Sequence, residues 1–327
     1  LKMAIKKFLC CLIVVCLPFF IWSCDRSPVA SSTPTINRKV LPISSENGGY
    51  SMGLYDMDGE IESERHLFLE DGQPFQKILS FGNYVDEENT YRLLVFLNYE
   101  QVAFSIDSEE PSRFYEFTAG PQEARQFSFQ LSPLPNGDYQ LLFLFVKDPA
   151  NQSLDEEYRK DTELSHLLSL RYSFTVGDSG NTDIPSQISL PETAITQTSL
   201  LDGILVNQSP DTAHGLDRLL TVRGKPMQPL DFYAHIGNSS DKEVPYALFW
   251  LYDWEQVPSS DGAFVSYFLL QPNTLASLKE TIQTPGEDGV HNLTAVCIQN
   301  PYLPADNRHR VDFSLRIGVG IFSEKEG

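Results

Sequence analysis

Two stretches of this chain repeat each other at long range. Residues 93–102 (LLVFLNYEQV) match residues 248–257 (LFWLYDWEQV), and both end in an aromatic residue followed by Glu-Gln-Val. Three further blocks match in the same order: 72–74 with 224–226, 81–83 with 236–238, and 136–149 with 288–301. The spacing of roughly 150 residues is far longer than the roughly 20–50 residues of a solenoid repeat. The chain therefore contains a duplicated domain.

Each copy has the pattern of a β domain. Runs rich in Phe, Leu, Val and Tyr are separated by turn sequences such as Asp58-Gly59, Pro135-Asn136-Gly137 and Asp261-Gly262. Residues 126–131 alternate polar and apolar, as a half-buried strand does. Three runs are apolar at both odd and even positions, which predicts central strands covered on both faces: 93–97, 141–146 and 247–252.

The block Gly137–Leu141 resembles the corner before strand F of immunoglobulin-like sandwiches, where a Tyr hydroxyl bonds back to the preceding turn. His291 takes the place of Tyr139 in the second copy, and Trp250 resembles the buried Trp of strand C. Leu141 and Leu293 stand where an antibody domain has its strand-F Cys. The resemblance implies an all-β chain of two tandem immunoglobulin-like β-sandwich domains without disulfides, with a jelly roll as the alternative.

We expect the first domain at 40–177, a polar linker at 178–198 and the second domain at 199–322. Within the first domain, residues 153–170 predict a short helix or an ordered loop, because leucines recur irregularly among acidic residues. Cys297 lies in an apolar run and is expected to be a buried core thiol.

The first 24 residues have a separate character. Lys6 and Lys7 precede an uncharged apolar run, 8–22, which is short for a membrane span of about 20 residues. The ending Ile21-Trp22-Ser23-Cys24 resembles the lipobox of bacterial lipoproteins, although Trp22 stands where a small residue is usual. This resemblance implies a signal peptide at 1–23, a covalent lipid such as palmitate on Cys24, and an extracytoplasmic protein anchored in a membrane. An uncleaved anchor helix and an ordinary secretory peptide are the alternatives. Residues 24–39 would hold the lipidated Cys and a flexible tether rich in Ser and Pro.

The charge balance restricts the partners. The first 23 residues contain three lysines and no acid, so the chain from Cys24 onward has 21 basic and 44 acidic residues, a net charge of −23. Nucleic acids and anionic lipid surfaces require basic patches, so neither is expected as a partner.

No catalytic motif is present. The six histidines are scattered, and the sequence contains no Gly-x-Ser-x-Gly elbow, phosphate-binding loop or dinucleotide fingerprint. We expect no enzyme, no cofactor and no metal. Asp56, Asp58 and Glu60 begin like a calcium loop, but Ile61 stands where an EF-hand requires Gly. A hairpin turn at Asp58-Gly59 is favoured there, with calcium binding as the alternative.

The repeated aromatic strand is the candidate contact surface. Trp250, Tyr252 and Trp254 recur at alternate positions of one strand, and aliphatic residues at the matching positions favour a core role for the stripe. Tyr99 and Trp254, at the strand ends, are expected to be exposed and to contact a ligand or a partner.

The sequence thus predicts a membrane-anchored, non-catalytic surface or binding module of the cell envelope, with an envelope protein or a glycan as partner. One alternative is an accessory subunit of an envelope assembly that binds a partner by β-strand addition. A hydrolase with an unrecognised pair of acids is the other.

Overall fold

The computed structural model describes residues 48–160, 166–178, 186–190, 192–197, 201–211, 217–304 and 310–323. All of them belong to one compact unit, Ile36–Gly327. Cys24, the leader and the tether lie outside the described residues. Within the described part, no helix is both long and apolar enough to cross a membrane.

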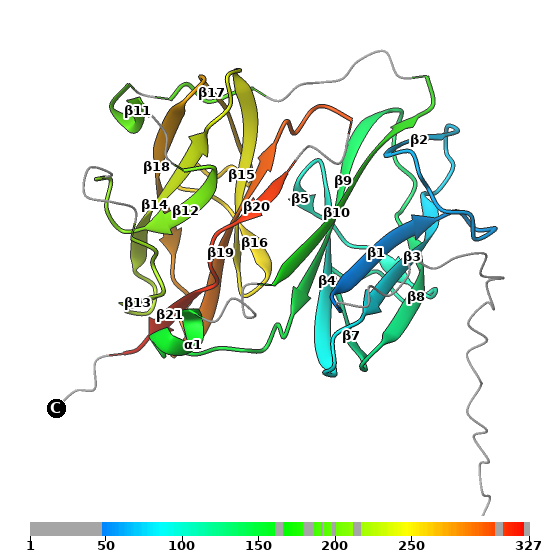
Figure 1. Ribbon diagram of the computed structural model, residues 1–327, viewed down its shortest axis with the longest axis horizontal. Helices are drawn as coiled ribbons and strands as arrows, with labels where there is room; N and C mark the ends of the chain where they lie inside the picture. Colours follow the sequence, from blue (N-terminus) through cyan, green and yellow to red (C-terminus); the bar gives the residue numbers. More distant parts are fainter. Residues whose placement is uncertain are drawn as a thin grey trace, which may run out of the picture. The chain divides into compact units, whose positions relative to one another are not determined.

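The first half of the described chain is a sandwich of two sheets (Figure 1). One sheet has the order β1-β3-β8-β6, and the other has the order β2-β10-β9-β4-β5, with β7 also paired to β4. All pairs are antiparallel except β2 with β10. The strands are β1 (Tyr50–Tyr55), β2 (His66–Leu69), β3 (Gln76–Asn83), β4 (Asn89–Leu97), β5 (Glu100–Gln101), β6 (Ser105–Ile106), β7 (Phe114–Ala119), β8 (Glu123–Gln130), β9 (Gly137–Lys147) and β10 (Leu167–Val176).

The second half repeats this arrangement. Its sheets have the orders β11-β18-β14-β12 and β13-β21-β19-β15-β16, with β17 paired to β15 and β20 paired to β19. The parallel pair β13 with β21 corresponds to β2 with β10. The elements are η2 (Glu192–Ala194), β11 (Ile195–Gln197), β12 (Gly203–Asn207), β13 (Thr221–Gly224), β14 (Pro229–Asn238), β15 (Val244–Tyr252), β16 (Glu255–Val257), β17 (Ser266–Leu270), β18 (Thr274–Gln283), β19 (Gly289–Gln299), β20 (Val311–Phe313) and β21 (Ile317–Ile321).

The chain is therefore all-β, with two tandem sandwiches of immunoglobulin-like strand order. The expected tyrosine corner is present, because the Tyr139 hydroxyl donates to the Pro135 carbonyl oxygen at 2.8 Å. Trp250 is 2% exposed in the core of the second sandwich, as predicted. Cys297 is fully buried, and burial raises the pKa of its thiol.

Two local expectations need correction. The helix α1 covers only Glu156–Lys160, and residues 167–170 belong to β10 because their backbone pairs with that of β9. The end of the expected linker joins a sheet, since β11 pairs with β18. The Ile188 backbone nitrogen also donates to the Tyr267 carbonyl oxygen at 2.7 Å.

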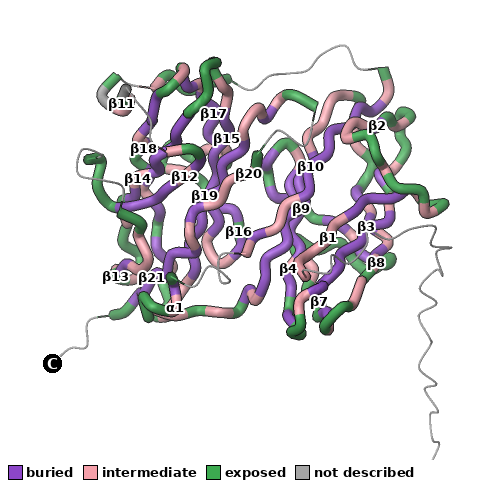
Figure 2. Tube along the Cα trace, in the orientation of Figure 1, coloured by how far each residue is buried: buried purple, intermediate pink, exposed green. Residues whose placement is uncertain are grey.

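The sandwiches share a third hydrophobic core. Each sandwich has its own internal core, and the outward-facing side chains of β4, β9, β15 and β19 form a further buried cluster between the two (Figure 2). Phe96 and Phe249 meet there with ring centroids 4.8 Å apart. This shared core explains why the central strands are apolar at both parities: one face lies inside its own sandwich, and the other lies against the second sandwich.

Candidate functional site

Tyr99 and Trp254 are buried between the sandwiches, contrary to the expectation of an exposed contact surface. They are 1% and 2% exposed. The Tyr99 hydroxyl donates to the Pro301 carbonyl oxygen, and Trp254 Nε1 donates to the Pro149 carbonyl oxygen, both at 2.8 Å. The partner that each aromatic contacts is thus the other sandwich of the same chain.

The local backbone is the physical reason for this correction. Asn98 and Tyr99 have φ angles of 50° and 67°, and Asp253 and Trp254 have 47° and 73°. Two consecutive residues with positive φ form the tight hairpin turn that matches strand twist. These turns take the two aromatics out of the alternation of β4 and β15, so they do not belong to the stripe that contains Trp250.

Two buried arginines complete the junction. Arg171 donates to four carbonyl oxygens of the second sandwich, those of Gln299, Asn300, Pro301 and Leu303. Arg316 of the second sandwich donates to the carbonyl oxygens of Lys147 and Asp148 in the first sandwich. Each guanidinium also lies over the aromatic ring of its own sandwich, Tyr99 or Trp254.

The calcium candidates form the hairpin turn that the sequence favoured. Asp56 Oδ1 accepts hydrogen bonds from the backbone nitrogens of Asp58 and Glu60, and Gly59 has a φ of 85°. Tyr55 and Ile61 form an antiparallel bridge across the turn. Among the described residues, no group of three or more His, Cys, Asp or Glu side chains is arranged for a metal ion. Calcium binding at this turn stays a prediction, which calorimetry with calcium can test.

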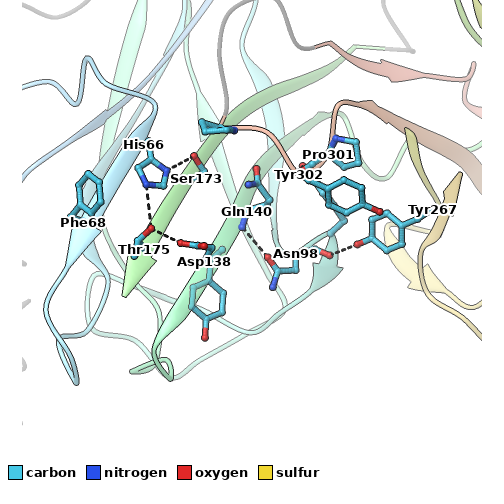
Figure 3. Close-up of a pocket in the computed structure, with 13 residues that line it drawn as sticks. His66, Phe68, Asn98, Asp138, Gln140, Ser173, Thr175, Tyr267, Pro301 and Tyr302 are labelled. Carbon is cyan, nitrogen blue, oxygen red and sulfur yellow. Dashed lines mark hydrogen bonds between the residues drawn. The ribbon is translucent and has the colours of Figure 1, made fainter. Parts of the chain in front are cut away.

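A pocket of about 340 Å³ lies beside the junction of the sandwiches (Figure 3). Its floor is the outer face of three neighbouring strands, and the second sandwich supplies one side. The lining residues are His66 and Phe68 from β2, Asp138, Tyr139 and Gln140 from β9, Ser173 and Thr175 from β10, Asn98 and Tyr99 from the β4–β5 turn, Tyr267 from β17, and Pro301, Tyr302 and Pro304 after β19.

Strand register gathers the polar side chains of the floor. Ser173 is opposite His66 on one side and Gln140 on the other, and Thr175 is opposite Asp138. Because alternate residues of a strand face the same side, these five polar side chains point together toward the pocket. Sequence reasoning missed this site, since His66 and Ser173 are 107 positions apart and no local spacing connects them.

A chain of hydrogen bonds runs across the floor. The Thr175 hydroxyl donates to Asp138 Oδ1 at 2.6 Å, so its oxygen accepts from His66 Nε2 at 3.2 Å. We therefore assign the ring proton to Nε2, which leaves Nδ1 to accept from the Ser173 hydroxyl at 2.9 Å. The chain fixes the orientation of the imidazole and of both hydroxyls.

The opposite side of the pocket is aromatic. The Tyr302 ring stacks on Tyr267 with centroids 5.4 Å apart, and the Tyr267 hydroxyl donates to the Asn98 carbonyl oxygen at 3.1 Å. Burial raises the pKa of Tyr302 to about 12, and its buried hydroxyl oxygen has no hydrogen-bond partner among the described residues. Such an unpaired buried polar atom costs about 1–3 kcal/mol.

The chain was compared with protein families, curated proteins and solved structures. No protein-family model and no curated protein matches the chain. Among solved structures, it is similar to the CARDB domain of the PF1109 protein of Pyrococcus furiosus, solved with di-metal ions, at 11% identity and a TM-score of 0.26, over 42% of this chain and 97% of that one.

Two further structures show likeness at the same level. PapD-like domain 7 of human CEP192 matches at 12% identity and a TM-score of 0.23, over 45% of this chain and 98% of that one. Red sea bream transglutaminase matches at 10% identity and a TM-score of 0.24, over 86% of this chain and 32% of that one.

Proposed function

We propose that this chain is a lipid-anchored, extracytoplasmic binding module that holds a small molecule in the pocket beside the junction. The pocket carries the proposal, because both sandwiches line it and it combines aromatic rings with a few convergent polar groups. Small-molecule sites of proteins have this composition and are frequent at domain interfaces. The leader and Cys24 support the anchor, since a basic start, an apolar run and a terminal Cys occur together there.

The geometry of the floor supports binding rather than catalysis. The Ser173 hydroxyl, bonded to His66, is the group that most resembles a nucleophile beside a base, but Ser173 is only 2% exposed. Its oxygen lies 3.3 Å from the Arg65 carbonyl oxygen as well as 2.9 Å from His66. Thr175 stands between His66 and Asp138, whereas in a catalytic triad the acid contacts the histidine directly.

Dialysis against a small-molecule extract of the host cell tests the pocket. The purified protein should retain at least one compound, identified by mass spectrometry, and His66→Ala should release it. The matched control is Thr221→Ala, because Thr221 has the register position of His66 in the second sandwich. Equal retention by wild-type protein and His66→Ala would contradict a binding role for this pocket.

The anchor has its own test. Cys24→Ala should move the protein from the membrane to the soluble extracytoplasmic fraction and abolish incorporation of labelled fatty acid. Membrane attachment that persists in Cys24→Ala, with no acyl label in the wild type, would contradict lipidation.

The edge of β2 favours a second candidate function, partner binding by strand addition. In the described part of the chain, β2 pairs with β10 alone, and Phe68 on this strand is 76% exposed. A strand of a partner could pair with the outer edge of β2 while Phe68 packs against it. A stoichiometric protein in pull-downs from membrane extract, lost in Phe68→Glu, would support this candidate over a small-molecule module.

A further inference from the structure

In the second sandwich, the surface that corresponds to the pocket floor is covered by another segment of the chain. Gly318 and Gly320 of β21 take the register positions of Ser173 and Thr175, and Asn292 takes that of Gln140. A Cβ atom built on Gly318 would lie 2.5 Å from the Ser153 carbonyl oxygen, and one on Gly320 would lie 2.6 Å from Leu154. The segment around Ser153 therefore packs directly on the glycine backbone.

Polar side chains hold that segment in place. Asn292 donates through Nδ2 to the Asn151 carbonyl oxygen at 3.0 Å and accepts from Arg159 Nη1 at 2.7 Å. Gln152 bonds to Asp253, which stands at the matching turn position of Asn98. The outer face of this sheet is thus built to be covered, and in the second sandwich a chain segment covers it.

The first sandwich has a different floor at the equivalent positions. Side chains with hydroxyl and carboxylate groups take the places of the glycines and the valine, because Ser173, Thr175 and Asp138 have the register positions of Gly318, Gly320 and Val290. These side chains prevent a peptide backbone from lying as closely as residue 153 does. An occupant here meets a layer of donors and acceptors instead of bare backbone.

The charge of the lining defines the chemistry of the occupant. Among the described residues that line the pocket, Asp138 is the one acidic side chain, and neither Lys nor Arg is present. The chain as a whole carries a formal charge of −20. An anionic ligand would find no Lys or Arg side chain to pair with among these residues, and a purely apolar one would desolvate the polar floor without compensation. A neutral ligand with several groups that both donate and accept hydrogen bonds fits this lining.

The aromatic residues add a second requirement. Phe68 is 76% exposed beside His66, with the two rings 4.9 Å apart and nearly perpendicular (Figure 3). The stacked rings of Tyr302 and Tyr267 lie on the other side of the pocket. An exposed aromatic ring offers a flat apolar surface for the C–H face of a sugar ring, while the hydroxyls of that sugar bond to the floor.

We propose that the pocket binds a neutral saccharide, with Phe68 as the stacking surface and Asn98 and the floor side chains as partners of its hydroxyls. This inference rests on the proposed binding function and specifies its ligand class. The volume of about 340 Å³ is near the lower limit of ligand pockets, which favours a mono- or disaccharide over a longer chain.

Saturation-transfer NMR and titration calorimetry with the full-length protein test the proposal. The probes are glucose, galactose, mannose, N-acetylglucosamine, maltose and cellobiose, with glucose 6-phosphate as the anionic comparison. At least one neutral sugar should bind, and the phosphorylated sugar should bind at least tenfold more weakly than glucose. Phe68→Ala should weaken binding at least fivefold.

The matched control is Met227→Ala, because Met227 is 67% exposed on the second sandwich. It should leave sugar binding unchanged, and unaltered melting of both variants shows that they fold. Binding of no neutral sugar, or equal binding by Phe68→Ala, overturns the saccharide proposal. If a compound from the cell extract is still retained in a His66-dependent way, the binding function stands and only the ligand class is wrong.

Discussion

Gln101 and Gln256 bind each other reciprocally across the junction of the two sandwiches. The backbone nitrogen of each donates to the side-chain oxygen of the other, and both distances are 2.7 Å. Their side-chain nitrogens donate onward in the same symmetric way, from Gln101 to the Trp254 carbonyl oxygen and from Gln256 to that of Tyr99. The repeated Glu-Gln-Val ending therefore marks the contact that joins the two copies.

Replacing either glutamine with alanine should destabilise the protein. Each substitution leaves the buried backbone nitrogen of the other glutamine unpaired, which costs about 1–3 kcal/mol. The double variant should lose more than either single variant, because it leaves both backbone nitrogens unpaired. Urea unfolding measures these free energies. Gln283→Ala, at an exposed position of β18, is the control and should change the stability by less than about 0.5 kcal/mol.

The shared core predicts that both sandwiches unfold together. Phe249 contacts Phe96 in this core, so Phe249→Ala should cost about 3–5 kcal/mol and weaken the junction more than either internal core. Calorimetry should show one transition for the wild type and two for this variant. Two separated transitions in the wild type would mean that the junction contributes little to stability.

The sequence predicted the sandwiches because the repeat and the strand patterns are local signals. Runs apolar at both parities, such as Leu141–Val146, correctly indicated strands covered on both faces. They could not indicate what covers them, since a second sandwich and a helix bury the same kind of side chain. The repeated Glu-Gln-Val block was the available signal that the second sandwich is the cover. Duplicated domains that contact each other symmetrically do so through equivalent residues.

The two errors of placement have different causes. The exposure of Tyr99 and Trp254 was predicted from the alternation of the strands, but the left-handed backbone of their turns interrupts that alternation. The preceding residues, Asn98 and Asp253, are of types that tolerate positive φ and are the signal for such a turn. The pocket depends on register between distant strands, which brings His66 to Ser173 and Thr175 to Asp138. No spacing along the chain encodes those two pairings.

His235 should make the protein sensitive to mild acid. It is fully buried, with Nε2 bonded to Asn207 Oδ1 at 2.9 Å and Nδ1 to the Ser277 hydroxyl at 2.8 Å, and burial lowers its pKa. Below a pH of about 6.5 the unfolded chain binds a proton that the folded chain excludes, so stability falls as the pH decreases.

The measurement is urea unfolding at pH 7.5 and pH 5.5. His235→Gln should destabilise at pH 7.5 through lost packing, and its deficit relative to the wild type should be smaller at pH 5.5. A deficit of equal size at both pH values would show that His235 does not titrate between them.

Glu280 should have the opposite dependence, a loss of stability as the pH rises. Its side chain is buried, and burial, with the negative charge of Asp261 as a second cause, raises its pKa to about 7. Below pH 4.5 both the folded and the unfolded chain hold the proton. Between pH 4.5 and 7 only the folded chain keeps it, so ionisation increasingly favours unfolding, and above pH 7 the penalty levels off at about 3 kcal/mol.

Glu280→Gln keeps the shape of the side chain and removes its charge. The variant should be more stable than the wild type at pH 8, by up to about 3 kcal/mol, and should match it near pH 4.5. Urea unfolding at the two pH values measures both differences, with Glu287→Gln, at an exposed turn position, as the control that should show neither. A gain that is the same at both pH values would mean that folding does not raise the pKa of Glu280.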